Sequence, residues 1–438
     1  MPSPHNKSLN SEIARLTLPN IISNITVPFM GMADIAIAGF IGGDVAIGSI
    51  TIGTTIFNMI YRNCSFLRMS GSGVTAQKYG AGDTEECIAT LARLLAIALS
   101  ISLLLLVIKR PICSLALDII GGSESTVSAA WLYIRARFWA VPASISLFAL
   151  NGWFIGMQKP QIPMLIAVIS NVVNICASFA LAVGGGMGIE GVAYGTVIAQ
   201  YTGLCVAICA ILMRFPTLPS LISWAVVWRK TELSRLFSVN RDIFLRTLCL
   251  TIVFTSFTAI SARYGDQVLA ANALILQFFT LFSYMIDGLA FAAESLIGRL
   301  VGSGGFSTLN AAVKKITIAG FITAALYTVV FAISWRAIFN CFSPSPETIE
   351  EAAHNIGWAI AMPFCCFFAF IADGIMVGAT KSAAMRNTMA CSTALFFTTY
   401  FLSRNAMGAH ALWLAFLVYM LARGVLLMPQ VRALGKKI

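Results

Sequence analysis

The sequence predicts an all-α integral membrane protein, with twelve transmembrane helices in two six-helix bundles related by a pseudo-two-fold axis along the membrane normal. Composition and an internal repeat predict this fold class. Hydrophobic residues make up 58% of the 438 residues and charged residues only 11%, and the mean hydropathy is +0.84. These values lie far outside those of soluble globular domains, so the helices are expected to contact lipid.

Twelve apolar stretches are long enough to cross about 30 Å of hydrocarbon. They fall near residues 18–41, 46–67, 88–108, 127–157, 161–184, 191–213, 243–262, 268–298, 312–334, 355–379, 383–403 and 408–429. Pro142 inside the fourth stretch predicts a kink there. The predicted organisation is an N-terminal six-helix bundle at 1–213, a cytoplasmic linker at 214–242 and a C-terminal six-helix bundle at 243–438.

The second observation is a repeat with an offset of 222 residues, the distance from Gly43 to Gly265, for example. Short motifs recur at this offset and at the same places in the hydropathy pattern: Gly43-Asp44 and Gly265-Asp266, Gly80-x-Gly82 and Gly302-x-Gly304, and Gly152-xxx-Gly156 with Lys159 and Gly374-xxx-Gly378 with Lys381. Because each half holds an even number of spans, both halves enter the membrane in the same direction. This pattern is typical of transporters built from parallel repeats.

Lysine and arginine gather in one set of alternate loops and at both chain ends, which predicts that both termini are cytoplasmic in a multi-pass cell-membrane protein. The net charge of +11 is explained by this asymmetry and by the anionic inner leaflet, so no nucleic-acid partner is needed. The first 21 residues lack the pattern of a cleaved signal peptide.

The eleven cysteines are scattered without a CxxC motif, and only three histidines are present. The sequence therefore predicts neither a disulfide framework nor a metal site. With no HExxH and no Gly-x-Ser-x-Gly motif, it also disfavours an intramembrane protease or acyltransferase. We expect a protein that is not an enzyme.

Asp34 lies in the middle of the first apolar stretch. A carboxylate at the centre of a membrane helix costs roughly 2.5–3.5 kcal/mol on insertion scales, so it is retained mainly where it faces a protein interior or a water-filled cavity. A buried carboxylate that takes up and releases a proton is the chemistry of a proton-coupled transporter. Asp34 is therefore the predicted proton-coupling residue.

Other polar side chains in apolar spans are candidates for a substrate or cation site. Asn171 and Asn174 share one face of the fifth span, where they either join helices or act as ligands. Asp287, Glu294 and Asp373 lie in the second half, either in a transport cavity or in a structural ion-pair network. Conceivable cationic partners for these carboxylates are Arg263, Arg299 and Arg336.

Several segments together resemble the multidrug and toxic compound extrusion (MATE) family, and specifically its DinF-like branch. They are LTLPNIISNITVPFMGMADIAIAGFIG, FLRMSGSGVTAQKYGAGD, NGWFIGMQKPQIPM, NRDIFLRTLCL, LAANALILQFF and YMIDGLAFAAESLIG. The resemblance implies an antiporter without a cofactor or obligate protein partner, which uses an inward H⁺ or Na⁺ gradient to expel cationic or amphipathic drugs across the lipid bilayer. It also implies that Asp34 is the protonation site.

The chain departs from this family at one position. The family often carries an aspartate in the fifth helix shortly after the asparagine pair, whereas this chain has Ser178 there. Asn171, Asn174 and Ser178 would then form a polar network around a single titrating group. The alternative is a flippase for lipid-linked saccharides, a related architecture in which clustered arginines and lysines would bind a pyrophosphate.

Overall fold

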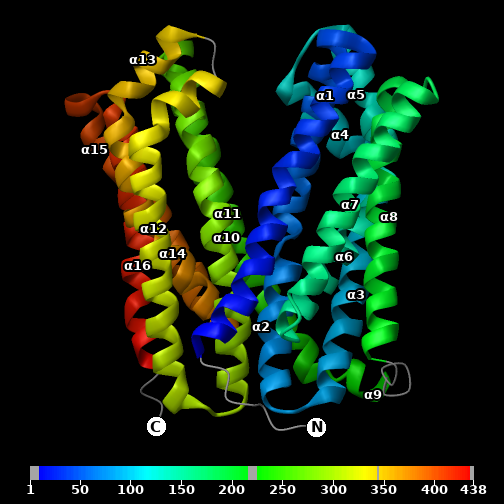
Figure 1. Ribbon diagram of the computed structural model, residues 1–438, viewed down its shortest axis with the longest axis vertical. Coiled ribbons are helices and arrows are strands. Elements are labelled where there is room, and N and C mark those ends of the chain that lie inside the picture. The colour runs from blue at the N-terminus through cyan, green and yellow to red at the C-terminus, as the bar shows by residue number, and fades with distance from the viewer. Residues whose placement is uncertain (1–8, 216–223, 343–344, 435–438) are drawn as a thin grey trace. The chain divides into compact units, whose positions relative to one another are not determined.

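The computed structural model describes residues 9–215, 224–342 and 345–434, which are helical almost throughout and contain no strand (Figure 1). The chain divides into two compact units. The N-terminal unit is Ile22–Leu236, and the C-terminal unit combines the described residues up to Ile21 with those from Phe237 onward. The first helix therefore contributes to both units. The predicted boundaries at residues 213 and 242 remain predictions.

Among the described residues, the N-terminal unit contains nine helices, the start of a tenth and two short irregular turns. These are α1 (Leu9–Cys64), α2 (Phe66–Gly80), α3 (Thr84–Val107), α4 (Lys109–Ile120), α5 (Glu124–Arg137), a 3₁₀ turn (Phe138–Ala140), α6 (Val141–Gly156), α7 (Gln161–Phe179), a π turn (Ala180–Gly184), α8 (Gly188–Arg214), α9 (Trp224–Val227) and the start of α10. Pro142 sits in the first turn of α6, and a 3₁₀ turn at Phe138–Ala140 interrupts the regular α-helix where the kink was predicted.

The long helix α1 is two membrane spans joined at Gly43, whose φ of 57° and ψ of −140° are not helical. Glycine tolerates a positive φ because it has no Cβ. The arm before Gly43 carries Asp34, and the arm after it carries Thr54. The spans predicted near 18–41 and 46–67 are therefore separate, as expected.

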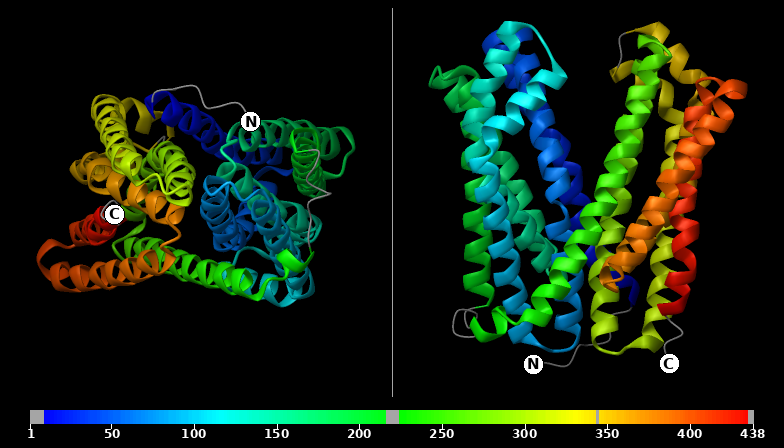
Figure 2. Two further views of the ribbon diagram at one scale, coloured as in Figure 1. Left: turned by 90° about the horizontal axis from the view of Figure 1, so that it is seen from below. Right: turned by 180° about the vertical axis from the view of Figure 1, so that it is seen from behind.

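In the described part of the C-terminal unit, the N-terminal turns of α1 are joined by seven further helices (Figure 1). These are α10 (Lys230–Arg263), α11 (Asp266–Gly302), α12 (Phe306–Phe342), α13 (Pro346–His354), α14 (Ile356–Gly378), α15 (Ser382–Met407) and α16 (His410–Leu434). α15 and α16 run side by side, as seen at the orange and red end of the chain in Figure 2.

Ten helical segments of the described chain are long and apolar enough to cross a membrane. The first, Leu9–Gly80, counts as two because of the break at Gly43. The 26-residue α15, which packs along α16, completes the predicted twelve. The all-α membrane fold is thereby confirmed.

The internal repeat is visible in the packing of each unit. A Cβ on Gly152 would lie 2.3 Å from the carbonyl oxygen of Arg68, and one on Gly374 would lie 2.4 Å from that of Ala290. Both residues of the second pair lie 222 positions after those of the first (374 minus 152, and 290 minus 68). α6 thus crosses α2 as closely as α14 crosses α11, and only glycine permits this approach of two backbones.

Backbone conformations repeat at the same offset. Positive φ angles occur in pairs 222 positions apart, at Gly43 and Gly265, Gly82 and Gly304, Gln158 and Thr380, and Gly186 and Gly408. The register between the two units is therefore constant from the first loop to the fifth. Any residue of one unit over this range can be compared with its counterpart in the other.

Charged contacts attach the segment after residue 223 to the N-terminal unit. Arg93 is 3% exposed; its Nε donates a hydrogen bond to the carbonyl of Val227 at 2.8 Å, and it also forms an ion pair with Glu86. Lys78 pairs with Glu232 at 3.0 Å. α9 and the first turns of α10 are thus held against α2 and α3.

Candidate functional site

Asp34 is buried in the N-terminal unit, with 3% of its surface exposed. Its carboxylate lies close enough to the guanidinium of Arg137 for the two charges to interact, and the amide of Asn174 lies beside it. Helices α1, α5 and α7 therefore bring the carboxylate of Asp34, the guanidinium of Arg137 and the amide of Asn174 into one region of the unit's interior.

Arg137 is held in this position from several sides. It donates hydrogen bonds to the Thr54 hydroxyl at 3.0 Å and to the Tyr133 hydroxyl. Its guanidinium also stacks on the rings of Phe57 and Tyr133, at 5.0 and 5.4 Å from their centroids. The N-terminal polar cluster is defined as Asp34, Thr54, Tyr133, Arg137 and Asn174.

The position of the Tyr133 ring requires a glycine, Gly53, in the second arm of α1. A Cβ on Gly53 would lie 2.3 Å from the Tyr133 ring, so the ring packs directly against the helix backbone at this glycine. Tyr133 is fully buried and presents its hydroxyl to Arg137. The backbone packing of α1 on α5 thus sets the position of the guanidinium.

Asn174 connects the cluster to α8. Its amide donates a hydrogen bond to the Thr196 hydroxyl at 3.1 Å and a long one to the Ser178 hydroxyl at 3.5 Å. Asn171, on the same face of α7, donates to the carbonyl of Thr26 on α1 at 2.9 Å. Asn171 thus joins two helices, whereas Asn174 reaches the acid.

Ser178 packs where α7 and α8 approach most closely. A Cβ on Gly195 would lie 2.2 Å from the Ser178 hydroxyl and 2.5 Å from its Cα. Ser178 is fully buried and donates to the carbonyl of Val192 at 3.3 Å. A small side chain suits this crossing, and it leaves Asp34 as the only carboxylate of the cluster.

Several buried polar atoms of the cluster retain unused hydrogen-bonding capacity among the described residues. Asp34 Oδ1, Arg137 Nε and Asn174 Oδ1 have no hydrogen-bond partner there. Buried polar atoms are usually paired, so an unpaired group calls for an explanation such as water, an ion or a catalytic role. The cluster can accept a proton or a polar ligand without first breaking a hydrogen bond at Oδ1.

The C-terminal unit holds a different cluster of buried charges. Asp373 accepts hydrogen bonds from two buried arginines, Arg423 at 2.8 Å and Arg246. Arg423 also stacks on Phe370 and Tyr419, with its guanidinium 5.5 and 5.6 Å from the ring centroids. One carboxylate oxygen, Oδ2, thus receives both guanidinium groups.

The partners of Asp373 are not among the arginines that the sequence analysis named as conceivable. Those were Arg263, Arg299 and Arg336, whereas Asp373 pairs with Arg246 and Arg423, which lie 127 and 50 residues away along the chain. Arg299 instead pairs with Glu12 of α1 at 2.7 Å. The pairing depends on how α10, α14 and α16 pack, which no local pattern reveals.

The other two candidate acids lie on α11. Asp287 is half-buried, and Glu294 is buried with 2% of its surface exposed. A Cβ on Gly378 would lie 2.6 Å from the carbonyl oxygen of Glu294, so Glu294 sits at the close crossing of α11 and α14. The structure therefore places the two α11 acids and Asp373 in the C-terminal unit and the Asp34 cluster in the other.

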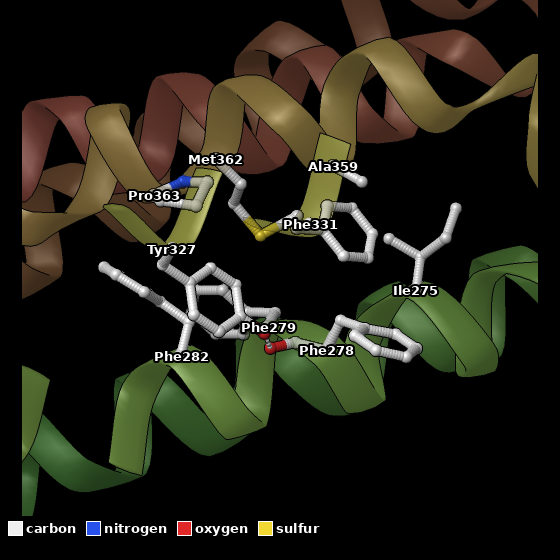
Figure 3. A pocket seen from close by; sticks show the side chains of 9 residues that line it. All are labelled: Ile275, Phe278, Phe279, Phe282, Tyr327, Phe331, Ala359, Met362 and Pro363. Atoms are coloured by element: carbon white, nitrogen blue, oxygen red, sulfur yellow. Dashed lines mark hydrogen bonds between the residues drawn. The ribbon is translucent and has the colours of Figure 1, made fainter. Parts of the chain in front are cut away.

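The C-terminal unit also contains a narrow apolar pocket between α11, α12 and α14 (Figure 3). Ile275, Phe278, Phe279, Phe282, Tyr327, Phe331, Ala359, Met362 and Pro363 line it. The Tyr327 hydroxyl donates to the carbonyl of Phe278 at 2.7 Å, so even the polar atom that reaches the pocket is satisfied. Ala359, which lines the pocket, is the counterpart of Arg137 (359 minus 137 is 222).

No group of three or more histidine, cysteine or carboxylate side chains able to hold a metal ion occurs in the described part of the chain. The site residues that sequence reasoning missed are the buried arginines, above all Arg137. A signal was present, because Arg135 and Arg137 are two positions apart and cannot share a helix face. The Arg135 side chain is indeed 62% exposed and pairs with Glu190, whereas Arg137 is 6% exposed.

The family model described as MatE matches residues 19–180 and, a second time, 243–402. The chain belongs to the MATE family. The two matches end 222 residues apart, which agrees with the repeat in the structure. MATE proteins are transporters and not enzymes, and twelve membrane helices suit this assignment.

The chain is similar to individual MATE proteins over almost its whole length. DNA damage-inducible protein F of Escherichia coli (strain K12) is 33% identical over 420 residues, which cover 95% of this chain and 91% of the relative. A probable multidrug resistance protein NorM of Bradyrhizobium diazoefficiens is 22% identical, over 98% of this chain and 94% of the relative. These relatives support a multidrug extrusion transporter in a membrane.

A solved structure supports the same fold. A MOP superfamily transporter from Pyrococcus furiosus superposes with a TM-score of 0.87 at 16% identity, covering 99% of this chain and 98% of that one. At this level of identity the likeness concerns the MATE fold alone.

Proposed function

We propose that this MATE protein is an antiporter in which Asp34 carries the coupling proton, and that it exports amphipathic organic compounds, including cationic ones, by alternating access. The observation that carries the proposal is a carboxylate 3% exposed in a membrane-spanning helix whose Oδ1 has no hydrogen-bond partner among the described residues. A buried acid with an open lone pair can take up a proton without rearrangement.

The surroundings of Asp34 favour a proton over sodium as the coupling ion. Arg137 places a positive charge beside the carboxylate. In a low-dielectric interior a second cation at this place would be repelled, whereas a proton neutralises the acid itself. Ser178 uses its hydroxyl hydrogen on the backbone of α8 and adds no second negative charge.

Asn174 and Ser178 are proposed to complete the polar surroundings of Asp34, and Asn171 to fix α7 against α1. Asp287 and Glu294 are proposed to interact with cationic groups of exported compounds. Both termini are proposed to lie in the cytoplasm, because the basic loops alternate with loops poor in lysine and arginine.

The buried charges do not favour the alternative function, a flippase for lipid-linked saccharides. A pyrophosphate would require several free buried cations, yet Arg93, Arg246 and Arg423 are each paired with a carboxylate in the described structure. Arg137, the remaining buried arginine of that part of the chain, faces Asp34.

The test is transport of ethidium into vesicles that contain the purified protein, driven separately by a pH gradient and by a Na⁺ gradient. We expect the pH gradient alone to drive transport, and Asp34→Asn to abolish it because the amide cannot exchange a proton. Asp44→Asn is the matched control, because Asp44 is exposed on the same helix. Full pH-driven transport by a folded Asp34→Asn protein would overturn the proposal, and transport driven by Na⁺ alone would assign a different ion.

A further inference from the structure

The C-terminal unit contains a second cavity, between the end of α12 and the short helix α13 (Figure 1). Its volume is about 450 Å³, which lies within the range of pockets that hold small ligands. Polar and aromatic side chains line one part of it and apolar side chains another: Trp335, Arg336, Asn340 and Glu350, then Pro346 and Ile349. The cavity is therefore amphipathic, unlike the aromatic pocket between α11, α12 and α14.

The spacing of these residues along the chain directs them to one place. Pro346, Ile349 and Glu350 lie three or four positions apart on α13, so they share a helix face. Arg336 and Asn340 lie four positions apart on α12 and share a face in the same way. The cavity is thus formed by two regular helix faces that meet.

The side chain of Arg336 is held by its neighbour Trp335. The guanidinium lies over the indole ring, 5.2 Å from its centroid, and the indole packs on the buried ring of Phe339 at 5.6 Å. A guanidinium that stacks through its flat face keeps the N–H donors in its plane available for an oxyanion. The ion pairs of the described chain include neither Arg336 nor Glu350.

The cavity lies where the apolar part of α12 ends. The span predicted near 312–334 stops directly before Trp335 and Arg336, and tryptophan and arginine at such a boundary are typical of the headgroup region of a bilayer. The repeat does not demand charges here, because the counterparts of Arg336 and Glu350 are Ser114 and Ser128 (336 minus 114 and 350 minus 128 are both 222). One base and one acid that are not paired with each other suit a ligand with one negative and one positive group.

We propose that this cavity binds the headgroup of a zwitterionic phospholipid, with the phosphate on Arg336 and Asn340 and the ammonium group on Glu350. Arginine binds phosphate oxygens through two parallel N–H donors, and an amide can donate a further hydrogen bond. The apolar wall of the cavity faces the glycerol and the start of the acyl chains. The inference does not depend on the proposed role of Asp34 in coupling.

The experiment measures lipid binding to the purified full-length protein in detergent by native mass spectrometry. The probes are dioleoyl phosphatidylethanolamine, which carries both charges, and dioleoyl phosphatidylglycerol, which carries only the phosphate charge. Arg336→Gln should weaken the binding of both lipids about fivefold, because each loses its phosphate partner at an exposed site. Glu350→Gln should weaken only the ethanolamine lipid, by a similar factor. Unchanged binding in a folded Arg336→Gln protein, or equal losses of both lipids in Glu350→Gln, would overturn the inference.

Two matched variants serve as controls. Arg404→Gln removes another arginine stacked on an aromatic ring, since its guanidinium lies 5.2 Å from the centroid of Phe401. Glu347→Gln removes another exposed acid from α13. Neither residue lines the cavity, so both variants should bind the two lipids as the unmodified protein does. Equal losses in the controls and in the cavity variants would indicate a general effect of surface charge and would reject the site.

Two further arms test the place and the source of the ligand. Ala353 also lines the cavity, so Ala353→Trp should fill it without a change of charge and weaken both lipids; undiminished binding would contradict the assignment. Free O-phosphoethanolamine has the same two charged groups without acyl chains, and it should displace the lipid only at a much higher concentration. Displacement at equal concentration would assign the cavity to a soluble ligand instead of a lipid. These readouts are independent of pH-driven transport, so their failure leaves the proposed function intact.

Discussion

The N-terminal polar cluster and the aromatic pocket of the C-terminal unit share one equivalent position of the repeat, that of Arg137 and Ala359. In one unit Arg137 meets Tyr133 and Phe57, whereas in the other Ala359 lies beside Phe279, the counterpart of Phe57 (279 minus 57 is 222). The close crossings at Gly152 and Gly374 are alike, but Arg137 belongs to a polar cluster, whereas Ala359 lines an apolar pocket. The two units therefore repeat a backbone framework while carrying different side-chain chemistry on it.

The buried acids Asp34 and Asp373 also differ, in the partners of their carboxylate oxygens. Asp34 faces one guanidinium and keeps Oδ1 without a partner among the described residues. Asp373 is paired with two arginines, and its counterpart in the N-terminal unit is Asn151. A carboxylate held by two buried guanidinium groups stabilises its unit, whereas one with an oxygen that lacks a hydrogen-bond partner can exchange a proton.

The largest effect on stability is expected at Asp373. Asp373→Asn leaves Arg246 and Arg423 buried without a counter-charge, and breaking a buried ion pair in this way typically costs about 3–5 kcal/mol. The melting temperature of the purified protein should fall strongly and transport should decline with the amount of folded protein. Thermal unfolding in detergent measures the first, and vesicle transport per folded molecule measures the second.

Asp266→Asn is the control for this change, because Asp266 is exposed at the start of α11 in the same unit. It should alter the melting temperature only slightly. A stable Asp373→Asn protein that has lost pH-driven transport would show that Asp373 is a coupling residue, and the contrast between the two acids would be wrong.

A smaller and symmetric effect is expected at the repeated helix crossings. Gly152→Ala and Gly374→Ala each push a methyl group into a backbone carbonyl, at 2.3 and 2.4 Å. Overpacking of this kind typically costs about 1–3 kcal/mol, so both melting temperatures should fall by similar amounts. Gly357→Ala on α14 is the control, since no atom lies within 4 Å of its Cβ position. A large loss at only one of the two sites would show that the crossings are not equivalent.

Much of the fold could be predicted from the sequence because local sequence patterns determine it. Apolar length predicts the spans, glycines at one offset predict the repeated crossings, and Pro142 predicts an irregularity in the fourth span, where the 3₁₀ turn between α5 and α6 lies. Asp34 was also visible, because an acid stands out in a run of apolar residues. Asn174 and Ser178 share a face of α7, where the amide donates a long hydrogen bond to the hydroxyl, and the network predicted for them and Asn171 around Asp34 stays a prediction.

The arginine partners of the buried acids could not be predicted from such local patterns. Arg137 reaches Asp34 from α5, and Arg246 and Arg423 reach Asp373 from α10 and α16, so each pairing depends on tertiary packing. The sequence shows only that these arginines lie near the ends or within apolar spans. Helical periodicity separates Arg137 from Arg135, but it does not say which of the two is buried or what it faces.

The central claim is that Asp34, and not Asp373, exchanges the coupling proton. The most direct measurement is proton release on binding of tetraphenylphosphonium to the purified protein in weakly buffered detergent solution, followed with a pH-sensitive dye. The account predicts that the unmodified protein and Asp44→Asn release a proton on binding and that folded Asp34→Asn releases none. Undiminished release from Asp34→Asn would contradict the account.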